Sequence, residues 1–556
     1  MTFRWMYSLA AAALLLPVAA QAQDVTKADL LQPLKDSWLT YNGDYTAKRY
    51  SELTAVNRTT VKNLSLGWTA KMVPGEAPAP LTGYSRVRAP LTTGGEGPGG
   101  FPNGGSLKGT YLEAKGILYV TMPDNVWAVD ARTGESLWHY YWKTRGGTHI
   151  GNRGVGLYGD YLFIEMPDNY LVSLDAKTGK ERWHKEYAKV EGGYFSSAAP
   201  VIVKNHVIVG VGNDIDSPAA LRSFDPETGD LQWTFWVTPQ KIGDPGLDTW
   251  KNLDAARHGG GGTWVAGAYD PETNLYMFGT GNPTPSWETG TRGEGDNLYT
   301  CSLVALDVDT GKLKWYFSTS PHDTHDYDSA QVPVLVDGIF KGRKRKMVVT
   351  AARNGYFFTL DRVTGERLVT TKYGETTNWA NGLTPQGGPK TNPEKDVAIG
   401  GTLISPNSGG TVNWQPPAYS PQTGLLYQYD SENYSLGYLT DPDPRGGMGL
   451  GGKDEVPIGT VSNSIVGIDY ATGKARWRHE LYTGATGGGG LLATAGGLVF
   501  SGDGQGNLIA LDAADGKALW NARIGSISNA PQTYLLDGHQ YILAGSGDTL
   551  YSFLLN

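Results

Sequence analysis

Residues 318–329, Ser-Thr-Ser-Pro-His-Asp-Thr-His-Asp-Tyr-Asp-Ser, concentrate side chains that can hold or move a proton. The acid/base groups in this stretch are His322, Asp323, His325, Asp326 and Asp328. An extended chain points alternate side chains to one side, so Asp326 and Asp328 are predicted to face one cavity. Two carboxylates held that close repel unless a proton or a cation lies between them, and oxygen ligands suit a hard cation. The alternative is a solvated acidic loop, which this segment alone does not exclude.

A repeated pattern, apolar-Asp-x-x-Thr-Gly-x-x-x-Trp, predicts the elements that position this segment, which follows the copy ending at Trp315. Asp-x-x-Thr-Gly is typical of a tight turn in which Gly takes a positive φ and the Asp and Thr side chains bind the turn backbone. Alternating apolar residues on either side predict a hairpin, and the Trp is predicted to wedge between neighbouring units. The copies occupy residues 130–138, 175–183, 225–233, 307–315 and 469–477, with variants at 361–369 and 512–520.

A recurring sheet unit with a Trp signature predicts a propeller or a β-solenoid. We favour the propeller because the insertions between repeats are unequal, and a ring tolerates them in its loops. With roughly 45–65 residues per blade, the mature length fits about eight blades. The sequence therefore predicts an all-β, eight-bladed β-propeller with tryptophan-docking repeats. Residues 23–556 form its single domain, with a polar loop at 371–400 and a probable cap or loop insertion at 430–459.

The N-terminus predicts export. Arg4 supplies a positive charge, residues 8–16 are apolar, and Ala20-Gln-Ala22 forms a small-x-small cleavage site, so residues 1–22 are a predicted signal peptide and the mature chain is predicted to be periplasmic. The apolar run is too short for a membrane span. A net charge of -8 argues against nucleic-acid binding. The single cysteine, Cys301, excludes an internal disulfide and a Cys-x-x-Cys-His haem site in this chain.

The repeats resemble those of the pyrroloquinoline-quinone (PQQ) alcohol dehydrogenases, the methanol and ethanol dehydrogenase family, over nearly all of the mature chain. Non-catalytic outer-membrane assembly propellers share this repeat, so function has to be inferred from the site. The segment 321–328 resembles the one that carries the family's catalytic aspartate, which falls on Asp326. Gly-Thr-Gly-Asn-Pro at 279–283 resembles the motif whose Asn, here Asn282, is a metal ligand. Ala-Arg-Asn-Gly at 352–355 is similar to the motif whose Arg, here Arg353, holds the quinone oxygens beside the catalytic base.

Further motifs resemble the family's cofactor contacts. Gly-Gly-Gly-Gly-Thr-Trp at 259–264 looks like the segment whose Trp, here Trp264, lies flat under the cofactor ring. Asn-Arg-Gly at 152–154 resembles the motif whose Arg, here Arg153, pairs with a PQQ carboxylate. Asn-Trp-Gln-Pro at 413–416, which begins at Asn413, resembles a further cofactor-contacting turn, and Thr263 and Ser197 are expected to contact the cofactor too. Each motif taken alone also has a structural interpretation as a turn, a core aromatic or an ion pair. Their joint occurrence in the family's order favours the PQQ site.

The resemblance also implies a metal. Two positions after the catalytic Asp, the family's calcium forms have a small neutral residue and its lanthanide forms an Asp, which here is Asp328. The remaining carboxylate ligand falls on Asp214, with Asp216 as the alternative. Asp214, Asp326, Asp328 and a PQQ carboxylate would place about four negative charges around one ion, which suits a trivalent ion better than a divalent one. The expected metal is therefore a lanthanide, with Ca²⁺ as the alternative.

Gly147 and Thr148 stand where the family has adjacent cysteines, and His149 is the candidate to cover that side of PQQ instead. The expected activity is oxidation of a small primary alcohol to an aldehyde, with Asp326 as base and a separate soluble cytochrome c as electron acceptor. A calcium-dependent polyol or sugar dehydrogenase is the alternative enzyme, and a non-catalytic assembly propeller is the alternative from another class. Neither the alcohol nor the oligomeric state follows from the sequence, which leaves a homodimer open.

Overall fold

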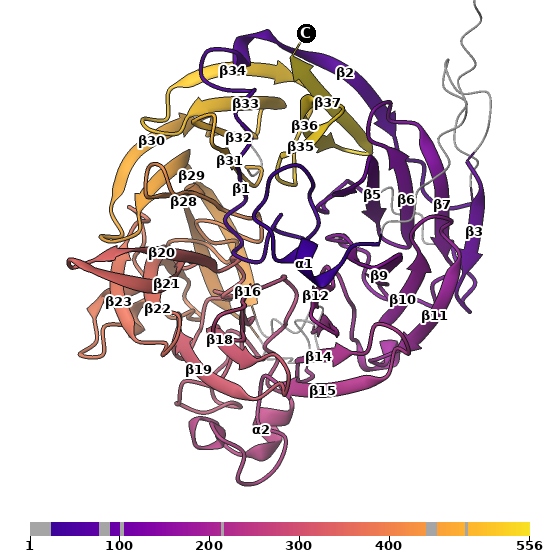
Figure 1. Cartoon of the computed structure of the whole chain (residues 1–556). Coiled ribbons are helices and arrows are strands. Elements are labelled where there is room, and N and C mark those ends of the chain that lie inside the picture. The colour runs from indigo at the N-terminus through magenta and orange to yellow at the C-terminus, as the bar shows by residue number, and fades with distance from the viewer. Residues whose placement is uncertain are drawn as a thin grey trace, which may run out of the picture.

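A computed structural model describes residues 24–76, 89–100, 105–212, 216–440, 453–483 and 488–555. Its strands form five four-stranded sheets, three five-stranded sheets and a separate two-stranded sheet within these residues. The sheets surround a common centre (Figure 1), which confirms the prediction of an all-β propeller. The helices are short: α1 (Lys27–Leu30), α2 (Leu253–Arg257), η1 (Val61–Asn63), η2 (Val190–Gly192), η3 (Leu247–Thr249) and η4 (Pro393–Lys395). No helix in these ranges is long and apolar enough to cross a membrane.

The sheets of the first half of the ring are mainly antiparallel stacks of consecutive strands, to which β3 adds a parallel edge. One sheet contains β3 (Leu91–Gly94), β4 (Leu112–Ala114), β5 (Ile117–Met122), β6 (Asn125–Asp130) and β7 (Ser136–Trp142). The second sheet contains β8 (Gly156–Tyr158), β9 (Tyr161–Glu165), β10 (Tyr170–Asp175) and β11 (Glu181–Glu186). The third contains β12 (Val201–Val203), β13 (His206–Val211), β14 (Ala220–Phe224) and β15 (Leu231–Trp236). The fourth contains β16 (Ala268–Asp270), β17 (Leu275–Gly279), β18 (Ser302–Asp307) and β19 (Leu313–Ser318).

The second half of the ring begins with the sheet of β20 (Val334–Phe340), β21 (Arg343–Ala351), β22 (Tyr356–Asp361) and β23 (Arg367–Lys372). Its neighbour contains β26 (Thr402–Ile404), β27 (Ala418–Ser420), β28 (Leu425–Leu439), β29 (Lys453–Asp469) and β30 (Ala475–Leu481). The next contains β31 (Leu492–Thr494), β32 (Leu498–Gly502), β33 (Asn507–Asp512) and β34 (Ala518–Arg523), with β1 (Tyr50–Ser51) at its edge. The last joins β35 (Gln532–Leu536), β36 (His539–Ser546) and β37 (Thr549–Leu555) to β2 (Leu64–Lys71), so the two ends of the chain close the ring in one sheet.

The tryptophans of the five full repeats pack as predicted, each against the turn of the next repeat. A Cβ on Gly179, whose φ is +67°, would lie 2.5 Å from Cε3 of Trp138, and Nε1 of Trp138 donates to the carbonyl of Ala176 at 3.2 Å. The glycine is therefore required twice, for its backbone conformation and for the close approach of the ring. The same packing joins Trp68 to Gly134, Trp183 to Gly229, Trp233 to Gly311, Trp315 to Gly365 and Trp477 to Gly516.

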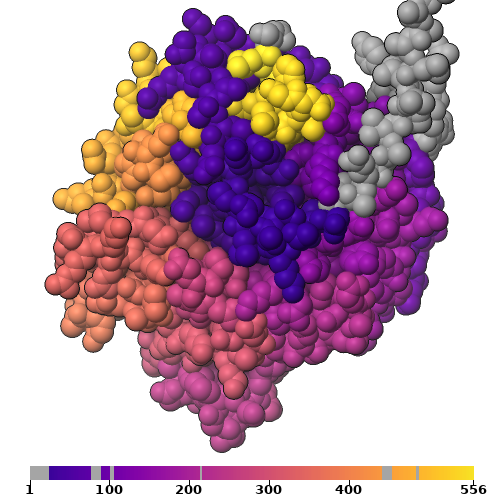
Figure 2. Space-filling view, viewed as in Figure 1, coloured from indigo at the N-terminus to yellow at the C-terminus, as the bar shows by residue number. Residues whose placement is uncertain are grey.

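The N-terminal segment lies over the middle of the ring on the face shown in Figure 2. Its strand β1 pairs in parallel with β31. The guanidinium of Arg49, next to that strand, is buried, lies 4.7 Å from the ring centre of Trp38, and donates to the carbonyls of Tyr41 at 3.0 Å and Leu491 at 3.2 Å. These contacts fix the segment to the propeller.

Two predicted loops contain strand residues in the structure. Residues 371–400 are not a plain polar loop, because β24 (Ala380–Leu383) and β25 (Pro389–Thr391) pair as a short hairpin followed by η4. The strand signal was weak because the hairpin is short and largely exposed. The predicted insertion at 430–459 begins and ends inside strands β28 and β29, which pair with each other, while residues 441–452 lie outside the described residues.

Candidate active site

One cavity of about 290 Å³ brings the predicted catalytic and cofactor residues together, and its volume is near the lower end of ordinary ligand sites. Its wall draws on segments that lie far apart in the sequence, from Lys108 to Trp414. The predicted residues that line it are Arg153, Ser197, Thr263, Trp264, Asp326, Asp328, Arg353 and Asn413. Asn282 contacts this group from behind Asp328. Asp214 lies outside the described residues.

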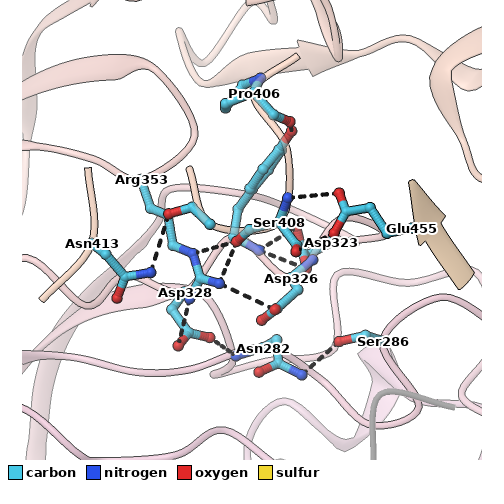
Figure 3. Close-up of polar contacts among 12 residues, drawn as sticks. Asn282, Ser286, Asp323, Asp326, Asp328, Arg353, Pro406, Ser408, Asn413 and Glu455 are labelled. Carbon is cyan, nitrogen blue, oxygen red and sulfur yellow. Dashed lines mark hydrogen bonds and ion pairs between the residues drawn. The ribbon is translucent and has the colours of Figure 1, made fainter. Parts of the chain in front are cut away.

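Asp326 reaches the cavity from a bent loop and not from the extended strand that the sequence predicted. Its φ is +65°, and the carboxylate of Asp323 accepts the backbone N–H groups of Asp326 at 2.8 Å and of Tyr327 at 3.2 Å. This side-chain cap competes with strand pairing. Asp326 and Asp328 nevertheless line the same cavity, as predicted (Figure 3).

Arg353 lies between the two carboxylates. Its Nη2 is 3.1 Å from Oδ2 of Asp326 and its Nη1 is 3.1 Å from Oδ2 of Asp328, and all three side chains are buried. Nε and Nη2 also donate to the carbonyl of Ser408, at 2.8 Å for Nε. A planar guanidinium can bind several acceptors at once, which suits it to this place. Arg353 thus supplies one positive charge between the paired carboxylates.

Asp328 is held by three donors. Besides Arg353, the backbone N–H of Asn282 donates to Oδ1 at 2.6 Å and Nε1 of Trp264 donates to Oδ2 at 2.9 Å. Burial raises the pKa of Asp328, whereas Arg353 and the two hydrogen bonds act in the opposite direction. The side-chain nitrogen of Asn282 donates to Ser286 Oγ at 2.6 Å, which orients the amide and leaves its carbonyl oxygen for another partner.

The donor set suits a hard cation, although it is incomplete within the described ranges. Those ranges hold no cluster of three His, Cys, Asp or Glu side chains that could bind a metal ion. Asp326, Asp328 and the amide oxygen of Asn282 are the oxygen donors present, and carboxylate and amide oxygens are the ligands that calcium-like ions prefer. The alternative ligand Asp216 instead pairs with Nδ1 of His258 at 2.9 Å.

Arg153 forms a cationic wall of the cavity. Its Cζ lies 4.7 Å from the ring centre of Trp264 and 5.0 Å from that of Trp414, and Nη1 donates to Ser197 Oγ at 2.6 Å. Burial lowers the pKa of Arg153 to about 10. No carboxylate pairs with it among the described residues, and its buried Nε has no hydrogen-bond partner there. A buried cation beside aromatic faces fits a flat ligand that carries carboxylates, as PQQ does.

Thr263 and His149, two expected neighbours of PQQ, have hydrogen-bond partners within the protein. Thr263 lines the cavity, but its hydroxyl is used on the backbone, where it accepts from Val211 N at 3.0 Å and donates to Ala220 O at 2.6 Å. His149 is not among the cavity-lining residues, and its Nε2 is 2.7 Å from Oδ2 of Asp124. The wall near His149 is formed by Ile150, whose carbonyl accepts from Nζ of Lys108.

Several wall residues of the cavity carry no recognisable sequence signal. Lys108, Ile150, Phe195 and Ser196 line the cavity but lie in no chemical motif, so no sequence signal singled them out. Trp414 could have been predicted as a wall residue, because it follows Asn413 in a motif that the sequence did single out. Asn413 donates to Gly409 O at 3.1 Å and accepts from Trp414 N at 2.9 Å, so it shapes the turn that presents the indole.

Comparison with known proteins supports the same family as the sequence motifs. Residues 38–378 match the PQQ family model described as glucose/ethanol/alcohol dehydrogenase, beta-propeller domain. A second model, that of the outer membrane protein assembly factor BamB, matches residues 453–553. The chain is 33% identical to the quinoprotein alcohol dehydrogenase PedH of Pseudomonas putida, in a match that covers 97% of this chain and 91% of the relative.

Two solved structures are similar along almost the whole chain. The quinohemoprotein alcohol dehydrogenase from Comamonas testosteroni has a TM-score of 0.82 and 28% identity, and the match covers 97% of this chain and 83% of that one. A europium-containing methanol dehydrogenase has a TM-score of 0.80 and 26% identity, with 94% of this chain and 98% of that one covered.

Proposed function

The chain belongs to the PQQ-dependent alcohol dehydrogenase family, and on that basis we propose that it oxidises a primary alcohol to an aldehyde in the cavity that holds Asp326. One observation carries the proposal: the buried pair Asp326 and Asp328, bridged by Arg353, lies in the same cavity as Arg153 and Trp264. A propeller that served only as an assembly scaffold would gain nothing from burying these charges together, since burying charges costs free energy.

The residues have separate tasks. Arg153 and the faces of Trp264 and Trp414 would bind the carboxylates and the flat rings of PQQ. When bound, PQQ supplies a quinone carbonyl carbon that accepts hydride from the carbinol carbon of the alcohol. Asp326, a buried carboxylate in the cavity, takes the hydroxyl proton as that hydride leaves, which balances the oxidation to an aldehyde. Arg353 favours the charged form of the base and orients it.

We assign a lanthanide to the metal site. Asp326, Asp328, the amide oxygen of Asn282 and, from the sequence alone, Asp214 would hold it, and the ion would polarise the quinone carbonyl as a Lewis acid. With Asp214 and a PQQ carboxylate included, about four negative charges would meet the single positive charge of Arg353, which favours a highly charged ion. One similar structure is a europium-containing methanol dehydrogenase. Ca²⁺ remains the alternative ion, in which case a polyol or sugar dehydrogenase is the second candidate function.

Further parts of the proposal concern the whole protein. We assign each four- or five-stranded sheet to one blade, which gives eight blades within the described residues. Export by residues 1–22 would place the chain in the periplasm. A separate soluble cytochrome c is the proposed electron acceptor, because a chain with one cysteine cannot form a Cys-x-x-Cys-His haem site of its own. A homodimer stays a prediction.

Replacing the base tests the proposed chemistry. Asp326→Asn keeps the shape of the side chain but cannot accept the proton, so turnover of primary alcohols is expected to fall by about 10²–10⁴-fold. The bound quinone, followed by its absorbance, should be retained because Arg153 and Trp264 are unchanged. The matched control is Asp396→Asn, which removes a carboxylate outside the cavity lining. This carboxylate accepts from Oγ1 of Thr324, in the loop of Asp326, at 2.7 Å. Normal turnover by Asp326→Asn would show that another group is the base.

A further inference from the structure

The position of Arg353 depends on the carbonyl of Ser408. That oxygen accepts from Nε and Nη2 on one edge of the guanidinium, while the remaining donors bind the two aspartates. A guanidinium is planar, so fixing one edge fixes the directions of the others. A shift of the Ser408 carbonyl would therefore displace Arg353 from Asp326 and Asp328 together.

Ser408 is in turn held by Glu455. One carboxylate oxygen of Glu455, Oε1, accepts the backbone N–H of Ser408 at 3.0 Å, and the other accepts its hydroxyl (Figure 3). Oε1 also accepts from Ser435 Oγ at 2.7 Å. Hydrogen bonds to a carboxylate are about twice as strong as neutral ones, and two of them on one residue fix the orientation of its peptide.

Glu455 and Ser435 belong to strands β29 and β28, outside the sequence motifs of the site. Glu455 is paired with Gly437 and is half-buried, whereas the neighbouring Asp454 is exposed. The contacts thus run from a hairpin through Ser408 to Arg353 and the base. The loop has a second, independent anchor in Asn433, which binds Asn407 N at 2.7 Å and Gly410 O at 3.1 Å. Removing the Glu455 carboxylate should therefore leave the loop folded but less well fixed at Ser408.

We propose that Glu455 is a positioning residue of the active site, which acts through Ser408 to hold Arg353 between Asp326 and Asp328. It touches none of the reacting atoms. Its carboxylate fixes the Ser408 carbonyl, and this carbonyl fixes the guanidinium. The proposal deepens the proposed function and rests on it for the role of Arg353 beside the base.

A double-mutant cycle separates this role from a general structural one. Glu455→Gln in the PQQ-loaded protein should lower kcat about tenfold, as expected for a lost supporting hydrogen bond, and leave KM for the alcohol unchanged. Arg353→Lys keeps the charge but loses the planar fork, so Ser408 no longer orients the aspartates through it. In that background Glu455→Gln should have no further effect on kcat. An equal loss in both backgrounds would overturn the proposal, as would an unchanged kcat in the single variant.

Affinity for PQQ provides a readout that needs no turnover. Quenching of tryptophan fluorescence on adding PQQ to metal-free, PQQ-free protein gives the Kd for PQQ. Because Arg353 lines the cavity that would hold PQQ, Glu455→Gln should raise this Kd when Arg353 is present. It should not raise the Kd further in the Arg353→Lys variant. If the wild-type protein binds PQQ but oxidises no alcohol, the proposed function fails while this cycle still decides the role of Glu455. Asp454→Asn, one residue away on β29, is the matched control and should match wild type. If Glu455→Gln does not fold, Ser408→Ala removes only the hydroxyl bond and should show the same dependence on Arg353.

Discussion

At the residue scale, Glu165 is a buried acid behind the cavity wall that the proposed chemistry does not use. It ends strand β9, its side chain is fully buried, and it accepts from the hydroxyl of Tyr187 at 3.0 Å. Burial raises the pKa of Glu165 to about 8 from 4.5, with Tyr187, Ser196 and Arg153 acting in the opposite direction. The folded protein therefore keeps a proton on Glu165 that the unfolded chain has already released.

This difference makes stability depend on pH. Between about pH 4.5 and 8 the folded state binds more protons at Glu165 than the unfolded state, so the free energy of unfolding should fall as pH rises and level off above 8. Glu165→Gln stays neutral and should remove this part of the slope. Thermal unfolding at pH 5, 6, 7 and 8 measures it, and the variant should gain Tm relative to wild type as pH rises.

The exposed Glu135→Gln supplies the control, since it removes a carboxylate that is not buried. It should give the slope of the wild-type protein. Parallel Tm curves for wild type and Glu165→Gln would contradict this account. They would show that the folded protein does not raise the pKa of Glu165 into this pH range.

At the element scale, the contact between a tryptophan and the next turn joins neighbouring sheets. Gly179→Ala puts a methyl group 2.5 Å from Cε3 of Trp138 and also forces alanine to a φ of +67°. Strain from the backbone costs about 1–2 kcal/mol, and overpacking adds about 1–3 kcal/mol. The free energy of unfolding, from denaturant titration, should fall by the sum.

Gly342→Ala separates these two costs. Gly342 has a similar φ of +77°, yet a Cβ there meets nothing within 4 Å, so only the backbone term applies. Gly179→Ala should therefore destabilise the protein more than Gly342→Ala. Equal losses would mean that the indole moves aside freely and that the tryptophan contact contributes little to holding the sheets together.

These elements were largely predictable because their cause is local. The Asp, Thr and Gly of each repeat make the turn and the Trp follows at a fixed offset, so one short window contains the signal. The conformation of Asp326 was not predictable in this way. Alternation in sequence suggested a strand, but the Asp323 carboxylate caps the backbone of Asp326 and Tyr327 and bends it. A side chain that binds its own loop leaves no periodic pattern.

At the scale of the whole molecule, the ring brings distant segments to one place. The motifs of Arg153, Trp264, Asp326 and Arg353 could be found in the sequence because each has its own local signature, and the cavity contains all four. The sequence did not reveal the wall residues Lys108 and Ile150 or the link from Glu455 to Arg353. Their roles depend on which loops meet at the cavity, and no short stretch of sequence specifies that. That arrangement is set by closure of the ring through β2 and β37 and by blade order, neither of which is encoded in a short window.

Reconstitution of the metal-free, PQQ-free protein tests the central claim most directly. PQQ is added with La³⁺ or with Ca²⁺, and dye-linked oxidation is measured over a panel of primary alcohols, polyols and sugars. We expect aldehyde formation from primary alcohols with PQQ and La³⁺, and little activity with Ca²⁺. Activity with Ca²⁺ but not La³⁺ would contradict the metal assignment. Retention of no quinone and no oxidation with either ion would contradict the assignment of this cavity as a PQQ alcohol dehydrogenase site.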